Sequence, residues 1–387
     1  MLSTSHKIPF NKPFTNEAIE QKVSENMRNN PLGEPEQESR LEALLRKTIA
    51  LSDQTDVLFT QSATQALEIM ALSLELNVGD EIILPSYTYA ATANAFARTG
   101  ATLIFADVAI ETLNITVDTV EPLITERTKA IIPIHYGGYA ADLYGLRDLS
   151  SRHSVKLLED AAHGIGASYD NKPLGTIGDM GCLSFHQSKN ITAGGAGGAL
   201  FINKEVIERS IVEIIFFQGT DRVAFLNGRT SAYHWQRLGG EYAMSPYAMA
   251  YLEASLSDLE AVTSHRNMLW KRYQKAFKEA FRDYAIILPS QIVHATGNGH
   301  IYYLIMPDTL SREGLRIYLK EKNIDAYTHY EPLHLSEGGK RYGKTRTNLI
   351  NTESIAKRMI RLPLYYALSI EEQDQVIEAV ITYVMQT

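Results

Sequence analysis

Cysteine is nearly absent: Cys182 is the single one among 387 residues, which excludes an internal disulfide and a cysteine-built metal site and suits a reducing compartment. No uninterrupted apolar run approaches the roughly 18 residues that a membrane-spanning helix needs. The formal net charge of −8 makes nucleic acid and anionic membrane poor partners. The first fourteen residues also lack the apolar core of a secretory signal. We therefore expect a cytoplasmic protein that binds neither nucleic acid nor membrane.

Two common kinds of ligand site are also missing. The segments that start at Gly164 and Gly195 begin like a dinucleotide-binding loop, but Tyr169 and Leu200 stand where the third glycine belongs. The eleven histidines include no pair at His-x-x-x-His spacing, and no acidic cluster accompanies them. The sequence therefore predicts neither a Rossmann cofactor site nor a metal site.

The chain does contain a regular alternation of short apolar strands and amphipathic helices. The predicted strands are 57–60, 81–84, 102–106, 130–134 and 155–158. Such alternation predicts an α/β fold with a mostly parallel sheet covered on both faces. A long helical stretch, 247–280, follows, and short strands and helices come after it. We place the domain boundary there, with a large domain and N-terminal arm at 1–250 and a small C-terminal domain at 251–387.

The most informative pair is Asp160 and Lys189. Asp160 ends a strand, and Lys189 follows about thirty residues later on a loop before the glycine run 194–198. Asp160 alone is equally well explained as a helix N-cap, and a lone lysine is usually a solvated surface residue. Together they have the chemistry that pyridoxal phosphate (PLP) requires. The carboxylate keeps the pyridinium nitrogen protonated, and the lysine amine forms the Schiff base.

The sequence also contains candidate residues for binding the phosphate and the ring of PLP. Ser62 is a natural N-cap, so the amides of Ala63 and Thr64 would form an anion site at a helix N-terminus. Ser184, five residues before the lysine, can reach the same phosphate. An aromatic ring at a strand end could stack on the pyridine, and the pattern leaves this open between two tyrosines, Tyr87 and Tyr89.

With these motifs the chain resembles the DegT/DnrJ/StrS family of sugar aminotransferases, PLP enzymes of the aspartate-aminotransferase fold (fold type I). The segments that carry the resemblance are Ser62-Ala63-Thr64-x-Ala66-Leu67, Pro85-Ser86-Tyr87-Thr88-Tyr89, Glu159-Asp160-Ala161-Ala162-His163, Ser184-Phe185-His186-x-x-Lys189 and His329-Tyr330-x-Pro332-Leu333-His334. The resemblance runs over nearly the whole chain. It implies a large domain with a mostly parallel seven-stranded sheet, a smaller C-terminal α+β domain, and a homodimer with active sites at the interface.

The resemblance also assigns roles to residues. It implies Lys189 as the catalytic lysine and places Tyr89 on the cofactor ring, with His163 beside it. The late segment with His329 and Tyr330 would reach the sugar. The full cofactor-binding set is Ala63, Thr64, Tyr89, Asp160, His163, Ser184 and Lys189.

A particular branch of the family is indicated by Tyr233-x-Trp235 ahead of Gly239 and by the segment 219–222. These look most like the enterobacterial-common-antigen type, which aminates dTDP-4-keto-6-deoxyglucose. We therefore expect a nucleotide-linked keto-deoxysugar as acceptor and glutamate as donor. Arg222 and Arg229 would suit the diphosphate, although solvated loop arginines explain them equally well.

Two positions depart from the family pattern, and three alternatives stay open. Ala196 stands where many members have glutamate, and Glu241 stands where many use a neutral residue on the partner's phosphate. An enzyme that aminates C-3 of a dTDP-3-keto-6-deoxyhexose would carry nearly the same motifs. A sugar dehydratase of this fold would have histidine in place of Lys189. A regulatory relative without turnover is the third alternative.

Overall fold

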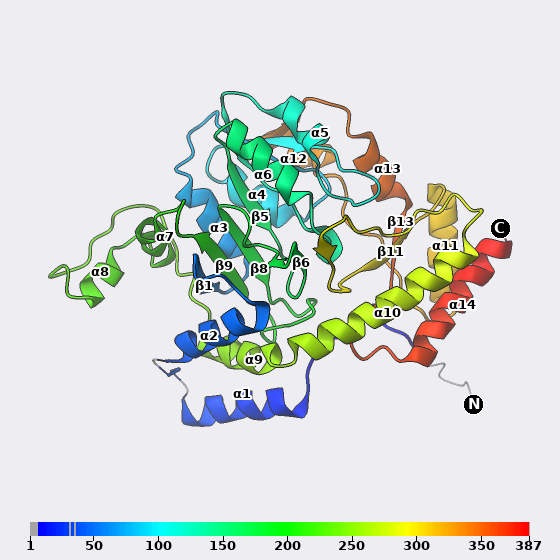
Figure 1. Cartoon of the computed structure of the whole chain (residues 1–387), viewed down its shortest axis with the longest axis horizontal. Helices are drawn as coiled ribbons and strands as arrows, with labels where there is room; N and C mark the ends of the chain where they lie inside the picture. The colour runs from blue at the N-terminus through cyan, green and yellow to red at the C-terminus, as the bar shows by residue number, and fades with distance from the viewer. Residues whose placement is uncertain (1–6, 31, 35, 387) are drawn as a thin grey trace.

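The computed structural model describes residues 7–30, 32–34 and 36–386, and it shows one large central sheet with helices on both sides (Figure 1). The sheet order is β1 (Thr55–Thr60), β9 (Gly198–Asn203), β8 (Met180–Ser184), β5 (Lys156–Asp160), β4 (Thr128–Ile131), β2 (Glu81–Pro85), β3 (Thr102–Ala106) and β12 (Gly343–Thr345). Only β9 runs antiparallel to its neighbours, β1 and β8. The α/β fold with a mostly parallel sheet is thus confirmed.

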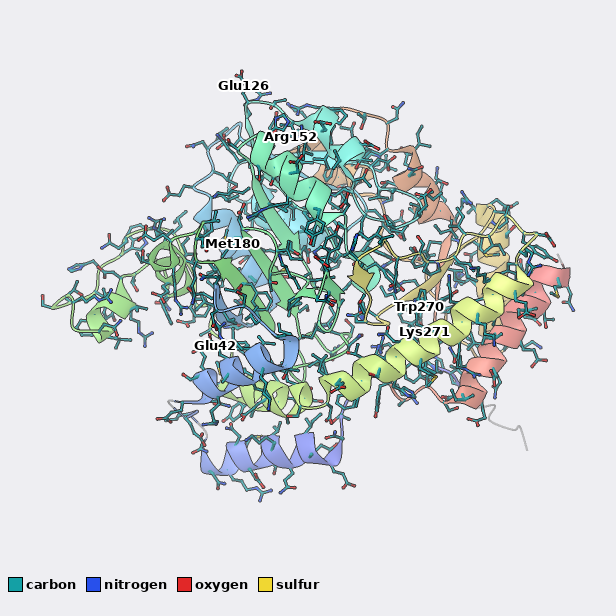
Figure 2. The ribbon with its side chains drawn as sticks, in the orientation of Figure 1. Glu42, Glu126, Arg152, Met180, Trp270 and Lys271 are labelled. Carbon is teal, nitrogen blue, oxygen red and sulfur yellow. The ribbon has the colours of Figure 1, made fainter. Side chains whose placement is uncertain are left out.

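Alternation along the strands explains why the sheet is covered on both faces. Successive side chains of a strand point to opposite faces, and here neighbours such as Leu157 and Leu158 enter two different apolar clusters. The helices between the strands cover these faces: α3 (Ala63–Ser73), α4 (Ala90–Ala97), α6 (Leu143–Arg152) and α7 (Arg209–Phe216). Figure 2 shows Met180 inside the sheet on β8, whereas Glu126 lies at the periphery.

The strand count differs from the expectation of seven, because β12 adds an eighth strand at the edge. It pairs in parallel with β3, from Gly343 opposite Leu103 to Thr345 opposite Phe105. Its three residues carry no apolar alternation, and two of them are exposed, so this segment has no local strand signal. The preceding helix α12 (Glu337–Tyr342) also packs near this edge, so the C-terminal part of the chain returns to the large sheet.

The predicted helical stretch 247–280 is two helices, α9 (Pro246–Leu256) and α10 (Leu259–Ala280), broken at Ser257 and Asp258. Serine and aspartate compete for backbone hydrogen bonds and favour helix ends, so a break there is physically reasonable. Beyond α10 lie a two-stranded sheet and three larger helices. These are β11 (Tyr302–Ile305) and β13 (Met359–Leu362), with α11 (Thr309–Glu321), α13 (Ile350–Arg358) and α14 (Ile370–Gln386). The division at residues 250 and 251 stays a prediction.

The N-terminal arm forms two helices, α1 (Glu17–Asn29) and α2 (Gln37–Ile49), and both pack against α9 (Figure 1). The remaining short elements are α5 (Val117–Val120), α8 (Arg222–Leu226), β6 (Ser168–Tyr169), β7 (Lys172–Pro173), β10 (Ala295–Thr296) and the 3-10 helices η1 (Glu121–Leu123), η2 (Tyr136–Gly138) and η3 (Leu333–Leu335). No helix among the described residues is both long and apolar enough to cross a membrane.

Candidate active site

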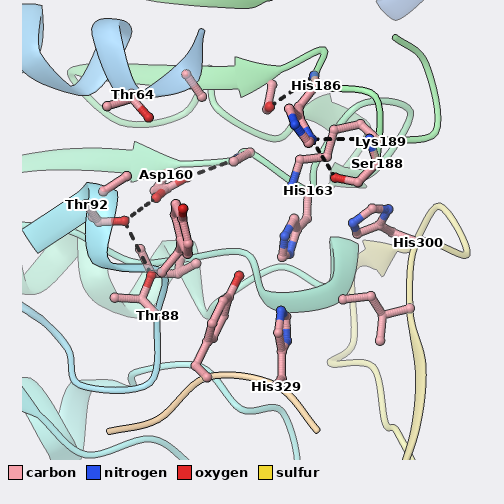
Figure 3. A pocket seen from close by; sticks show the side chains of 18 of the residues that line it. Thr64, Thr88, Thr92, Asp160, His163, His186, Ser188, Lys189, His300 and His329 are labelled. Atoms are coloured by element: carbon pink, nitrogen blue, oxygen red, sulfur yellow. Dashed lines mark hydrogen bonds between the residues drawn. The ribbon is translucent and has the colours of Figure 1, made fainter. Parts of the chain in front are cut away.

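A cavity of about 520 Å³ lies at the carboxyl ends of the parallel strands, where α/β proteins place ligand groups (Figure 3). Its walls come from the N-terminus of α3, the loop between β2 and α4, the end of β5 and the loop after β8. The C-terminal part contributes residues around β11 and β13 and the segment with His329 and Tyr330. Segments more than 200 residues apart in the sequence therefore meet at one site.

Asp160 lies at the end of β5, in the middle of the sheet, and its carboxylate faces the cavity. The Thr92 hydroxyl donates to Oδ2 at 2.6 Å, and the Ala162 N–H donates to Oδ1 at 3.1 Å. The Cys182 thiol lies 3.8 Å from Oδ1. These donors fix the orientation of the carboxylate and leave it able to accept from a protonated ring nitrogen in the cavity.

Lys189 lines the same cavity and is half-buried on the loop after β8. Burial lowers the pKa of its ammonium to about 8, an effect that the charge of Asp160 partly opposes. A lysine near this value is partly neutral close to physiological pH, so it is available as a nucleophile and as a proton carrier. The structure thus brings the two residues of the sequence-predicted pair into one cavity.

The N-terminus of α3 forms a cradle that fits a phosphate. Ser62 caps the helix by accepting from the Gln65 N–H at 3.3 Å, and Ala63 and Thr64 line the cavity. Gly198 packs directly behind, since a Cβ there would lie 2.6 Å from the Ala63 nitrogen. Only glycine allows this close approach. Together with an accessible amine and a carboxylate, the cradle fits PLP.

The two tyrosines that the sequence left open have different places. Tyr89 is 65% exposed and lines the cavity, whereas Tyr87 is 1% exposed and its hydroxyl points to the Met359 sulfur at 3.4 Å. Tyr87 is therefore a core residue. Tyr89 is the one placed to contact a ring in the cavity.

The remaining predicted residues on the wall are Ser184, His163, His329 and Tyr330. His163 accepts from the Gly137 N–H through Nδ1 at 3.1 Å. Burial and the nearby Lys189 lower its pKa well below the ordinary value, so the ring is neutral with its hydrogen on Nε2. His329 stacks on Tyr330, with ring centroids 3.6 Å apart.

The cavity residues that escaped the sequence analysis include Thr92, His300 and Arg361. Thr92 belongs to a helix that carries no motif, and its role shows only through the contact to Asp160. Arg361 donates twice to the Thr328 carbonyl, at 3.2 and 2.8 Å, and its guanidinium lies 4.8 Å from the Phe10 ring centroid. His300 and Arg361 come from the far end of the chain, and only folding brings them to Lys189.

Arg222 is not brought to the cavity within one chain. It lies on α8, on a segment that projects from the body (Figure 1), and its guanidinium sits 5.8 Å from the Phe217 ring centroid. Glu241 accepts from Gln218 Nε2 at 3.1 Å and does not line the cavity either. The sugar-diphosphate role of Arg222 stays a prediction. No group of three metal-ligating side chains occurs in the described part of the chain.

The fold and the cavity define the class: this is a PLP-dependent aminotransferase of fold type I. Residues 13–381 match the model of the DegT/DnrJ/EryC1/StrS aminotransferase family. The match spans far more than half of the chain, and the chain belongs to that family. The resemblance seen in the motifs is thereby confirmed at the level of the family.

Relatives extend this similarity. The chain is 29% identical to the spore coat polysaccharide biosynthesis protein SpsC of Bacillus subtilis over 386 residues, 97% of each chain. It is 30% identical to a pleiotropic regulatory protein of Geobacillus stearothermophilus over 320 residues, 82% of each. The PLP form of the putative sugar aminotransferase Spr1654 from Streptococcus pneumoniae superposes with a TM-score of 0.87 at 25% identity. That match covers 98% of this chain and 99% of the other.

Proposed function

We propose that this enzyme transfers an amino group from glutamate to a nucleotide-linked keto-6-deoxysugar in the cytoplasm. The preferred acceptor is dTDP-4-keto-6-deoxyglucose, which would become the dTDP-4-amino-4,6-dideoxyhexose of a polysaccharide precursor, as in enterobacterial antigen synthesis. The observation that carries the proposal is the placement of Lys189 and Asp160 in one cavity beside a helix N-terminus.

The chain's own residues supply the steps of an amino transfer. PLP, when bound, provides the electron sink that makes the Cα proton of an amino acid removable. Lys189 would attach the cofactor and, once displaced by the donor, move a proton between the donor's Cα and the cofactor's C4′. Asp160, held by Thr92, would accept the hydrogen bond of the ring N–H.

The other predicted residues would bind rather than react. Ala63, Thr64 and Ser184 would hold the phosphate through the helix terminus and a hydroxyl. Tyr89 and His163 would contact the ring, and the neighbouring His329 and Tyr330 would face the sugar. The polysaccharide name of one relative and the sugar name of a structural neighbour support a sugar acceptor.

A homodimer with sites at the interface would account for the projecting segment around α8. Its large side chains Tyr233, Trp235 and Leu238 are at least half exposed, which is costly for a free monomer surface. In such a dimer Arg222 would be available to the diphosphate in the partner's cavity. Light scattering should give twice the chain mass of 43.3 kDa, and a value of one chain mass would contradict this arrangement.

The acceptor is tested by its product. Purified protein loaded with PLP is incubated with dTDP-4-keto-6-deoxyglucose and glutamate, and the position and configuration of the new amine are assigned by NMR. A 4-amino sugar supports the proposal. A product only from the 3-keto isomer supports the alternative 3-aminotransferase. No product with either, together with no change of the cofactor's visible band on adding glutamate, supports the regulatory alternative that one relative's name suggests.

A further inference from the structure

His300 shares the cavity wall with Lys189, but no motif pointed to it. Its side chain is 9% exposed, and its ring centroid lies 4.5 Å from that of His163. Figure 3 shows His163, His300 and Lys189 gathered on one side of the cavity. His300 therefore lies beside the amine proposed to react, but the proposed mechanism of amino transfer assigns no role to His300.

The neighbouring amide of Asn190 fixes which ring nitrogen of His300 carries the hydrogen. Asn190 Nδ2 donates to the Asn298 carbonyl at 2.9 Å, so its Oδ1 faces His300 Nδ1 at 2.8 Å. The reversed amide would set two acceptor oxygens against each other. Because an amide oxygen only accepts, Nδ1 is the donor. Burial and the charge of Lys189 also lower the pKa of His300 well below its ordinary value, so Nε2 keeps a free lone pair.

The backbone holds the ring in place as firmly as the side chain does. The His300 N–H donates to Asn298 Oδ1 at 3.1 Å, and Asn298 Nδ2 donates to the His163 carbonyl at 2.7 Å. Arg266, a buried residue of α10, donates to the His300 carbonyl at 2.9 Å. The orientation of the imidazole is therefore built into a buried network rather than left to solvent.

The other groups near Lys189 either present an N–H or already have a partner or a part in the proposed function. His163 and His186 both accept backbone N–H groups at Nδ1, at 3.1 and 3.2 Å, so each presents an N–H at Nε2. Nδ1 of His329 shares a hydrogen with the Tyr136 hydroxyl at 2.6 Å. Asp160 accepts from Thr92 and Ala162, and the proposed function assigns its remaining accepting capacity to the ring N–H of the cofactor. His300 lines the same cavity as the lysine, and its Nε2 is a neutral acceptor.

We propose that His300 is a positioning residue for the proton transfer, and that its Nε2 accepts a hydrogen bond from the Lys189 amine once the donor has displaced it. Such a bond would hold the flexible lysine so that its nitrogen stays next to the substrate. Asn190, the residue after Lys189, joins the lysine loop to the same imidazole. The inference rests on the assignment of Lys189 under the proposed function.

Two matched substitutions distinguish the role of His300 Nδ1 from that of His300 Nε2. His300→Asn keeps an N–H where Nδ1 donates to Asn190 but has no acceptor in place of Nε2, whereas His300→Gln places an amide oxygen near Nε2. In a single half-reaction with glutamate, followed by stopped-flow absorbance, His300→Asn should slow the cofactor's conversion to its amine form by about 10–100-fold. A larger rate difference between ordinary and α-deuterated glutamate should accompany it. His300→Gln should recover most of the rate.

A double substitution shows through which residue His300 acts. In Lys189→Ala protein supplied with methylamine as an external base, adding His300→Asn should cause no further loss. If His300→Asn slows the half-reaction of the Lys189→Ala protein as much as it slows that of the unaltered protein, His300 acts on the substrate directly. That result would overturn the proposal.

The hydrogen position can be read without turnover. Nitrogen NMR of the imidazole in the unaltered protein, with and without PLP, should show the hydrogen on Nδ1 of His300, and a hydrogen on Nε2 would also overturn the proposal. This spectrum keeps the inference testable if His300→Asn does not fold. Mapping of the PLP attachment to Lys189 checks the underlying assignment separately.

Discussion

Glu159 and Asp160 are consecutive residues of β5, but their carboxylates have opposite surroundings. Glu159 is fully buried and accepts four hydrogen bonds, from His135 Nε2 at 2.9 Å and from the N–H groups of Gly175, Ile177 and Gly178 at 2.9, 2.6 and 2.5 Å. Asp160 accepts from Thr92 and Ala162 and faces the cavity. Alternation along the strand sends one carboxylate into the protein and the other to the site.

The difference shows what separates a structural acid from a functional one. Burial alone would raise the pKa of Glu159, but the hydrogen bond from His135 and the N–H donors hold it below its usual value. Every lone pair that Glu159 can use is taken, so it can stabilise the loop 175–178 but cannot take part in chemistry. Asp160 keeps accepting capacity toward the cavity, which is the capacity a ligand needs.

The largest effect on activity should follow the loss of the Asp160 charge. Asp160→Asn keeps the size of the side chain, so the fold should be retained while the turnover number falls by about 10²–10³-fold. Steady-state amino transfer measures the loss, with the unfolding midpoint in urea as the control for stability. Activity within a fewfold of the unaltered protein would contradict the role of Asp160.

Glu159 should show the reverse pattern, with its main effect on stability. Glu159→Ala leaves the His135 imidazole and three N–H groups without an acceptor, and it should cost about 3–5 kcal/mol of the free energy of unfolding. Denaturant unfolding followed by circular dichroism gives the value. A loss below about 1 kcal/mol would mean that water replaces the carboxylate, and Glu159 would not be the structural member of the pair.

The pH at which the apoprotein captures PLP should report the state of Lys189. Its pKa of about 8 lies below the ordinary 10.5, so the neutral amine that reacts becomes more abundant as the pH rises through 8. The capture rate should therefore increase nearly tenfold between pH 6 and 7 and level off above pH 8 to 9. The growth of the visible absorption band measures it. A rate that still rises about eightfold between pH 9 and 10 would show an unperturbed lysine.

The smallest effect should come from the hydroxyl that supports Asp160. Thr92→Val keeps the shape of the side chain but removes the 2.6 Å donor, and a hydrogen bond to a charged group of about 1.5–3 kcal/mol predicts a roughly 10–100-fold lower kcat/KM. Thr92→Ser is the matched control and should stay near the original value. Equal losses in the two variants would indicate a packing role for the Thr92 methyl group instead.

Sequence reasoning identified those parts of the site that lie in local motifs. A strand followed by Asp160, a capped helix at Ser62 and a lysine before glycines each carry a short-range signal, and the fold class and the cofactor followed from them. The local pattern alone did not choose between Tyr87 and Tyr89, and the assignment to Tyr89 came from the family resemblance. The alternation of strands and helices likewise predicted the parallel sheet correctly.

What sequence reasoning missed depends on contacts between distant segments. His300 reaches the cavity because Asn190 and Asn298 hold it, across 110 residues of chain. The edge strand β12 forms because β3 offers unpaired backbone groups, not because of its own residues. Neither the position of His300 nor the strand β12 could be predicted from residue spacing or composition.

The central claim is that Lys189 carries the cofactor in the cavity that Asp160 faces. The direct test is to incubate the purified protein with PLP, reduce it with borohydride, digest it and locate the modified lysine by mass spectrometry. The account predicts one pyridoxyl group per chain, attached to Lys189. If glutamate is added before the reduction, without a keto acceptor, the account predicts no pyridoxyl group on the protein. Attachment at another lysine, or no stable attachment, would contradict it.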